Sequence, residues 1–154
     1  MLKEKLTNIL EKKYLSFLRT QEARNKPFRD KLVQLKKFYL PICEKIYQDY
    51  HKDKKIKIIG LAGGQGAGKS TITQIITLIL KTKYNLSVVY FSIDDFYKTS
   101  SERKKISKKT HQLFIVRGVP GTHDTNLIKK TFISLSKKNF KPLSIPCFDK
   151  SRDE

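Results

Sequence analysis

The chain has 154 residues, of which 38% are hydrophobic, and its 33 basic residues against 14 acidic ones give a formal net charge of +19 at pH 7. This length allows one domain with a hydrophobic core. The hydrophobic fraction is too high for a disordered polycation, and the apolar runs are too short for a helix that spans a bilayer. The composition therefore predicts a globular protein and excludes an integral membrane protein.

The positive charge raises the question of nucleic-acid binding, because basic surfaces attract phosphates. Most of the basic residues are lysines, whereas recognition of bases and phosphates favours arginine. The lysines occur in pairs along the whole chain, as at Lys36-Lys37 and Lys104-Lys105. Such pairs are typical of solvated helix faces, so the pattern disfavours nucleic acid as a partner. An NTPase associated with nucleic acid stays an alternative that the charge alone supports.

Two features bear on the cellular compartment. The first residues are charged and lack the apolar stretch of a secretory signal. Cys43 and Cys147 are too few for a disulfide framework or a zinc site, so both are predicted to be buried thiols. These features predict a cytoplasmic protein.

Apolar residues recur at helical spacing through the first fifty residues, as at Leu6 and Leu10, and Pro41 predicts the start of another helix. This stretch carries no recognisable chemistry. Residues 1–52 are therefore predicted to be a helical segment that packs on a core formed by residues 53–154.

The pattern changes at residue 56. Residues 56–62 and 87–93 are β-branched and mostly apolar, which is typical of strands buried on both faces, and residues 70–83 between them have the periodicity of a helix. Strand, helix and strand predict a βαβ unit in a parallel sheet. The polar residues 97–110 are predicted to be a loop, with or without a short helix, and residues 124–138 a further helix.

The segment GGQGAGKS at residues 63–70 matches the phosphate-loop pattern G-x-x-x-x-G-K-[ST] at every fixed position. Glycines let backbone N–H groups close around phosphate oxygens, and the start of the following helix adds its positive dipole end. Lys69 is expected to reach the β- and γ-phosphates, Ser70 to ligate Mg²⁺, and Thr71 to hold the α-phosphate side. The predicted ATP-binding residues are Gly63, Gly64, Gln65, Gly66, Ala67, Gly68, Lys69, Ser70 and Thr71. The predicted fold class is α/β, a P-loop NTPase-type parallel sheet with flanking helices after an N-terminal helical segment.

Two adjacent acids, Asp94 and Asp95, follow the second predicted strand, at the edge of the sheet where ligands bind. They are predicted to supply a base for a substrate hydroxyl, and Asp94 an outer ligand for Mg²⁺. Because like charges lie so close, one pKa is expected to be raised. The alternative for Asp95 is a helix cap.

Four blocks in order resemble the P-loop kinases of the phosphoribulokinase, uridine kinase and pantothenate kinase group. The blocks are residues 63–71, FSIDDFY at 91–97, RGVPGTHD at 117–124 and PCFDKSRD at 146–153. The last two blocks most resemble plant-type D-glycerate 3-kinases.

This resemblance implies that MgATP phosphorylates the hydroxyl of a small molecule, such as D-glycerate or another anionic alcohol. The predicted catalytic residues are Lys69, Asp94 and Asp95, of which Asp94 falls where the resemblance implies the catalytic aspartate. The implied substrate-binding residues are Arg117, Phe148, Asp149, Lys150 and Arg152. His123 and Asp124 are expected to cap the helix that follows them.

The kinases of this group continue beyond the last block into a further strand, a lid and an adenine-binding segment. The chain is therefore expected to be the N-terminal part of such a kinase, with an incomplete sheet and doubtful turnover. Two alternatives are a nucleotide-binding module without catalysis and half of a split kinase, whose sheet a partner chain completes.

Overall fold

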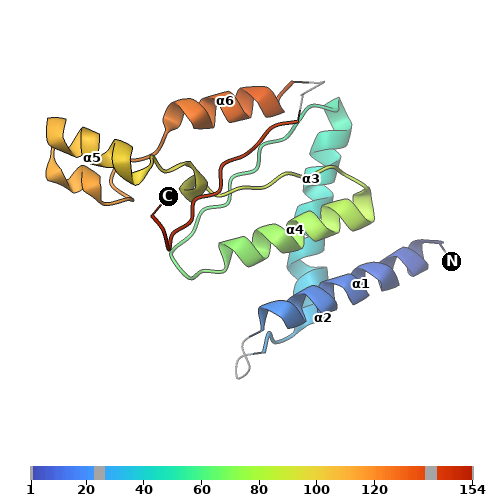
Figure 1. Ribbon diagram of the computed structural model, residues 1–154. Helices are drawn as coiled ribbons and strands as arrows, with labels where there is room; N and C mark the ends of the chain where they lie inside the picture. The colour runs from blue at the N-terminus through green and yellow to red at the C-terminus, as the bar shows by residue number, and fades with distance from the viewer. Residues whose placement is uncertain (1, 23–26, 138–141, 154) are drawn as a thin grey trace. The chain divides into compact units, whose positions relative to one another are not determined.

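The computed structural model describes residues 2–22, 27–137 and 142–153, and it divides into two compact units, Met1–Tyr90 and Phe91–Glu154 (Figure 1). Two predicted segments end at Lys138 and Glu154, which lie outside the described residues.

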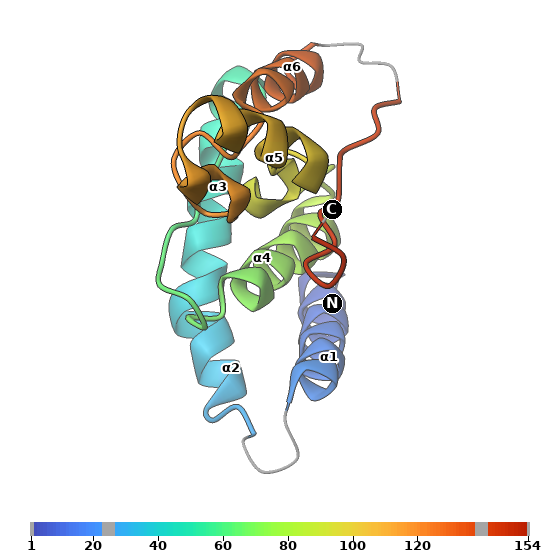
Figure 2. The same ribbon diagram turned by 60° about the vertical axis from the view of Figure 1, so that its left-hand side comes forward.

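The first unit is built from helices. They are α1 (Leu2–Gln21), α2 (Lys31–Gln34), the π-helical turn η1 (Leu35–Tyr39), α3 (Leu40–Asp53) and α4 (Lys69–Tyr84). The segments α2, η1 and α3 follow one another without a break and form one rod, which α4 crosses (Figures 1 and 2). Pro41 stands at the start of α3 but inside this continuous rod, and it lacks the N–H that another residue would donate to the preceding π-helical turn. The helices predicted in the first fifty residues and over 70–83 are confirmed.

The core of the first unit lies where α1 and the α2–α3 rod meet α4. Its buried side chains are Leu10, Tyr14, Leu18, Leu35, Cys43, Ile75, Ile79 and Leu80. The spacing of four residues along α1 and along α4 puts each set on one helix face. Burying each large side chain contributes roughly 1.5–3 kcal/mol. The core therefore fixes α4, the helix that directly follows the phosphate loop.

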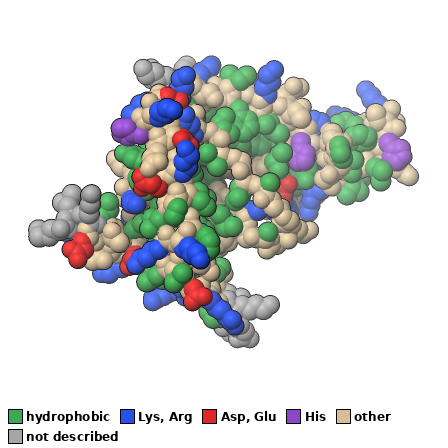
Figure 3. All heavy atoms as spheres, turned by 180° about the vertical axis from the view of Figure 1, so that it is seen from behind, with side chains coloured by type: hydrophobic (Ala, Val, Ile, Leu, Met, Phe, Trp, Pro, Cys, Tyr) green, Lys and Arg blue, Asp and Glu red, His purple; other side chains and the backbone are tan. Residues whose placement is uncertain are grey.

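The predicted α/β fold with a parallel sheet is wrong, because the described residues contain no β-strand. Residues 56–62 and 87–92 have no regular secondary structure, and Ile58 and Ile59 are 62% and 60% exposed instead of buried between layers. Figure 3 shows hydrophobic side chains reaching the surface among the charged ones. β-Branched residues favour an extended backbone locally, but a strand also needs a neighbouring segment that completes its hydrogen bonds. The sheet edge that was expected to pair with a partner chain is therefore also missing from the described part.

The second unit contains the 3₁₀ turns η2 (Ile93–Phe96) and η3 (Gln112–Ile115) and the helices α5 (Ser100–Lys109) and α6 (Thr125–Leu135). The expected loop over residues 97–110 thus contains a full helix, which a capping box between Thr99 and Glu102 begins. Asp124 caps α6 by accepting a hydrogen bond from the Leu127 N–H, as predicted. A single antiparallel bridge joins Tyr97 and His123 among the described residues.

The two cysteines differ in exposure. Cys43 is completely buried between α3 and α4, as predicted, whereas the prediction of a buried Cys147 is wrong because its side chain is exposed. The apolar residues near Cys147 gave no sign of this, since exposure depends on what packs over a segment. No helix within the described ranges is long and apolar enough to cross a membrane.

Candidate functional site

The predicted phosphate loop turns the chain into the N-terminus of α4. Gly66 has a φ of 75° and Gly68, the residue before the helix, a φ of 77°. Both angles lie in the left-handed region, which disfavours any residue with a Cβ. A Cβ at Gly64, Gly66 or Gly68 would meet no atom within 4 Å. The need for glycine at 66 and 68 therefore comes from backbone conformation and not from crowding.

The Lys69 side chain folds back over this loop. Its Nζ donates hydrogen bonds to the carbonyl oxygens of Gly63 and Gly64, each at 2.7 Å. Ser70 and Thr71 follow in the first turn of α4. The residue before this helix is Gly68, which has no side chain to cap the first N–H groups. An ammonium group and the N-terminus of α4 thus lie at the same end of this helix, an arrangement suited to an anion.

Asp94 pairs with a lysine from the end of the described chain. Its Oδ2 accepts a hydrogen bond from Lys150 Nζ at 2.8 Å. This ammonium group holds the pKa of Asp94 below its usual value, with smaller contributions from the Tyr97 hydroxyl and from His123. A rise was expected for one of the two neighbouring acids, and at Asp94 the pKa shift has the opposite direction. Asp94 is a carboxylate at neutral pH.

Both carboxylate oxygens of Asp95 accept hydrogen bonds from backbone N–H groups. Oδ2 accepts a hydrogen bond from the Ser92 N–H at 2.8 Å and completes a capping box, while Oδ1 accepts one from the Phe148 N–H at 3.4 Å. Asp95 thus belongs to the capping box of η2, whereas the alternative had expected it to cap a helix over Phe96-Tyr97. Its catalytic role stays a prediction.

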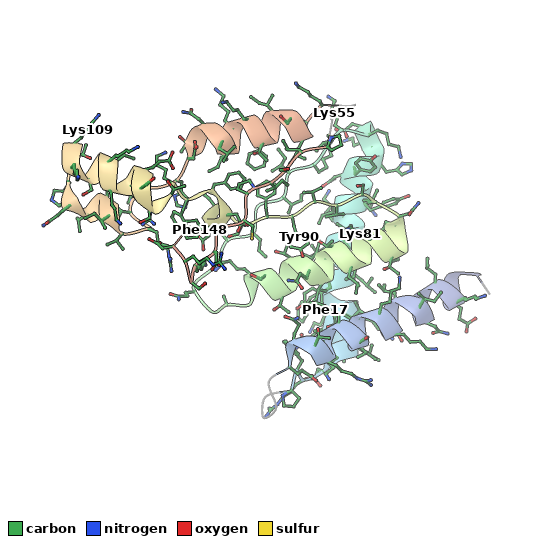
Figure 4. The ribbon with its side chains drawn as sticks, in the orientation of Figure 1. Phe17, Lys55, Lys81, Tyr90, Lys109 and Phe148 are labelled. Carbon is green, nitrogen blue, oxygen red and sulfur yellow. The ribbon has the colours of Figure 1, made fainter. Side chains whose placement is uncertain are left out.

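Aromatic side chains pack beside Asp94. Tyr97 stacks on His123 with ring centroids 4.1 Å apart, and it meets the ring of Phe148 edge to face at 5.3 Å. Phe148 is 9% exposed and lies in the C-terminal segment labelled in Figure 4. The sequence analysis missed Tyr97 and expected His123 to act as a cap. The signal for Tyr97 was its place in the block that contains Asp94.

Arginines hold the segment that carries Lys150. Arg117 Nη1 donates to the Lys150 carbonyl at 3.1 Å and to Asp153 Oδ1 at 3.0 Å, and its guanidinium lies 5.7 Å from the centre of the Phe148 ring. Arg103, which the sequence analysis did not single out, donates to Asp153 Oδ2 at 2.5 Å. The second unit thus brings Asp94, Arg117, Phe148 and Lys150 together.

Asp149 and Arg152 face one another instead. Their side chains lie 3.5 Å apart, and Asp149 also accepts hydrogen bonds from the N–H and hydroxyl of Ser151. Arg152 is 83% exposed in its side chain. No contact between these two side chains and Asp94 is found among the described residues, and their role in substrate binding stays a prediction.

The expected Mg²⁺ ligands belong to different units, Ser70 to the first and Asp94 to the second. Within the part of the chain that the structure describes, no three histidine, cysteine or acidic side chains form a group that could hold a metal ion. In kinase sites Mg²⁺ takes only one or two protein ligands and is held mainly by phosphates and water. An exposed hydroxyl such as Ser70 in the first turn of α4 fits that kind of binding.

No protein-family model matches the chain. Over 117 residues it is 37% identical to the uncharacterized kinase mug58 of Schizosaccharomyces pombe, an alignment that covers 72% of the chain and 42% of that protein. Over 102 residues it is 36% identical to the probable ATP-dependent kinase TDA10 of Saccharomyces cerevisiae, which covers 61% of the chain and 35% of that protein.

The solved structure of the YGR205w protein matches with a TM-score of 0.60 and 28% identity, over 75% of the chain and 42% of that protein. The chain is therefore similar to proteins named as kinases, and it spans less than half the length of each of the two curated relatives.

Proposed function

We propose that the chain forms part of an ATP-dependent kinase that transfers the γ-phosphoryl group of ATP to a hydroxyl of a small molecule. The phosphate loop carries this proposal: residues 63–68 lead through a left-handed Gly68 into α4, and the Lys69 ammonium lies against the loop. The similarity to proteins named as kinases supports the same reading.

In this proposal the first unit binds the nucleotide. Backbone N–H groups at the start of α4 donate to phosphate oxygens, and Lys69 exchanges its two carbonyl partners for phosphate oxygens, which are stronger acceptors because they are charged. The Ser70 hydroxyl would hold Mg²⁺. When bound with ATP, this ion neutralises charge on the β- and γ-phosphates.

The second unit prepares the acceptor. Asp94 accepts a hydrogen bond from the acceptor hydroxyl and takes its proton, while the hydroxyl oxygen forms a bond to the γ-phosphorus and the bond to the β-phosphate oxygen breaks to release ADP. Because Lys150 lowers the pKa of Asp94, this carboxylate is a weak base. Its main contribution is then to orient the hydroxyl.

The finer part of the proposal is an anionic acceptor, such as D-glycerate. The positive groups of Arg117 and Lys150 near Asp94 suit a carboxylate on the acceptor. This acceptor class also agrees with the resemblance of residues 117–124 and 146–153 to D-glycerate 3-kinases.

Nucleotide binding tests the loop. We expect Lys69→Ala to weaken the affinity for MgATP at least about tenfold in isothermal titration calorimetry, because a charged hydrogen bond contributes roughly 1.5–3 kcal/mol. Lys81→Ala is the matched control, since Lys81 is an exposed lysine further along α4 (Figure 4). Unchanged affinity in Lys69→Ala would refute the assignment of the loop.

Turnover tests the second unit. ATP consumption is measured with D-glycerate and with a panel of other small alcohols, neutral and anionic. We expect Asp94→Asn to lower the rate about 10²-fold through loss of orientation, without changing nucleotide affinity, and Asp49→Asn on α3 to have no effect. MgATP binding without turnover on any acceptor would favour the alternative of a nucleotide-binding module.

A further inference from the structure

Arg103 on α5 is a charged side chain with only 1% exposure. A buried guanidinium is costly to desolvate unless its donors are paired. Its Nε donates to the Lys98 carbonyl at 3.0 Å and its Nη1 to the Ile115 carbonyl at 2.6 Å. Its Nη2 donates to both the carbonyl and the Oδ2 of Asp153, at 3.2 and 2.5 Å. Arg103 thus ties α5, the end of η3 and the C-terminal turn to one buried point.

Asp153 joins Arg103 to Arg117. Its Oδ2 meets Arg103 and its Oδ1 meets Arg117 at 3.0 Å, so one carboxylate bridges two guanidinium groups. These two arginines hold the pKa of Asp153 below its usual value. Asp153 also has a φ of 60°, in the left-handed region that aspartate enters more readily than most other non-glycine residues.

The turn fixed in this way carries Lys150. The side chain of Lys150 is 60% exposed, so packing does little to hold it against Asp94, its partner 56 residues earlier in the sequence. Its backbone is held instead, because Arg117 binds the Lys150 carbonyl and Asp153 anchors the turn three residues later.

We propose that Arg103, Asp153 and Arg117 form a latch that places Lys150 against Asp94, which makes Arg103 and Asp153 positioning residues of the candidate site. Any contribution of the latch to phosphoryl transfer rests on the proposed function. Its effect on the pair of Lys150 and Asp94 does not, and can be measured without catalysis.

A competing anchor lies on the other side of Lys150. Phe148 is buried against Tyr97, and its N–H donates to Asp95. If this anchor alone placed Lys150, loss of the Asp153 charge would leave the pair with Asp94 intact. The two explanations therefore differ in what Asp153→Asn does to Asp94.

The test follows the pair of Lys150 and Asp94 by NMR in the whole chain at a single pH, through the cross-peaks between the Lys150 side-chain protons and the Asp94 β-protons. Lys150→Met, which lacks the ammonium group, gives the level of an unpaired side chain. We expect Asp153→Asn to weaken the cross-peaks most of the way to that level, and Arg103→Lys to do the same. Asp149→Asn is the matched control, because Asp149 lies in the same turn but contacts neither Arg103 nor Arg117. It should leave the cross-peaks close to those of the unaltered chain.

Two results would overturn the latch. Cross-peaks between Lys150 and Asp94 that keep their full strength in Asp153→Asn would assign the placement of Lys150 to Phe148. If the backbone amides of α6 lose their protection from hydrogen exchange in Asp153→Asn, the latch would instead be a general support of the second unit. Asp153 is a more informative site than Arg103, because its side chain is only partly buried and its replacement is less disruptive. The result with Asp153→Asn therefore tests the latch even if Arg103→Lys fails to fold. If Asp153→Asn releases Lys150 while the chain shows no turnover on any acceptor, the latch stands and the proposed function fails.

Discussion

Asp94 and Asp95 are neighbours in the sequence but have different surroundings in the structure. Their adjacency predicted a shared site with one raised pKa. Lys150 instead pairs with Asp94 and lowers its pKa, and Asp95 binds two backbone N–H groups. Both differences come from residues more than fifty positions later, Lys150 and Phe148, whose arrival the local sequence did not reveal.

The two thiols provide a test at the same scale. Burial raises the pKa of Cys43 to about 12, whereas Cys147 is exposed. Because the thiolate is the reactive form, we expect one fast-reacting thiol per folded chain with a disulfide reagent at pH 8. Cys147→Ser should abolish the fast reaction, and Cys43 should react only after unfolding in urea. Two fast thiols in the folded chain would contradict the burial of Cys43.

At the scale of elements, α4 links the core to the candidate nucleotide site. Its middle and end pack against α1 and α3 through Ile75 and Ile79, while its first turn carries Lys69 and Ser70. Periodicity predicted this helix because its apolar residues face one side. Periodicity did not predict the full length of α5, because this helix has no apolar stripe. Its exposed residues are polar, and its single fully buried residue is the charged Arg103.

Truncating the core of α4 tests this link. Ile79 is completely buried, so we expect Ile79→Ala to lower the free energy of unfolding in urea by about 2–5 kcal/mol. Ile42→Ala on α3 is the control, since Ile42 is 46% exposed, and it should change stability by only about 0.5 kcal/mol. Equal losses in the two variants would contradict the assigned core.

At the scale of the whole molecule, the ion pairs and hydrogen bonds of the few acids govern the response to acid. The carboxyl groups with a pKa below the usual value are Glu22, Glu44, Asp53, Asp94, Asp149 and Asp153. A lowered pKa means that the unfolded chain takes up protons at a higher pH than the folded chain. The stabilisation is therefore complete above the ordinary carboxyl pKa of about 4 and is lost as the pH falls through the lower values of the folded state.

We accordingly expect the midpoint of urea unfolding to fall as the pH is lowered from about 6 to about 3. Protonation also increases the net positive charge and so the self-repulsion of the folded chain. Asp153→Asn removes one of these carboxylates and should make the pH dependence shallower. A midpoint that does not change over this range would contradict the lowered pKa values.

Features that depend on neighbours along the chain could be predicted from the amino-acid sequence. Helical spacing predicted α1, α3, α4 and α6, and the glycines of residues 63–68 predicted a turn into a helix N-terminus. Each of these follows from contacts or backbone angles within a few residues.

Tertiary structure decided the rest, because it depends on which distant segments meet. The apolar residues 56–62 were predicted to be a strand, yet no ladder forms in the described residues, since a strand needs a partner that its own sequence does not specify. In the same way, only the approach of the C-terminal turn decided that Lys150 pairs with Asp94 and that Arg103 is buried.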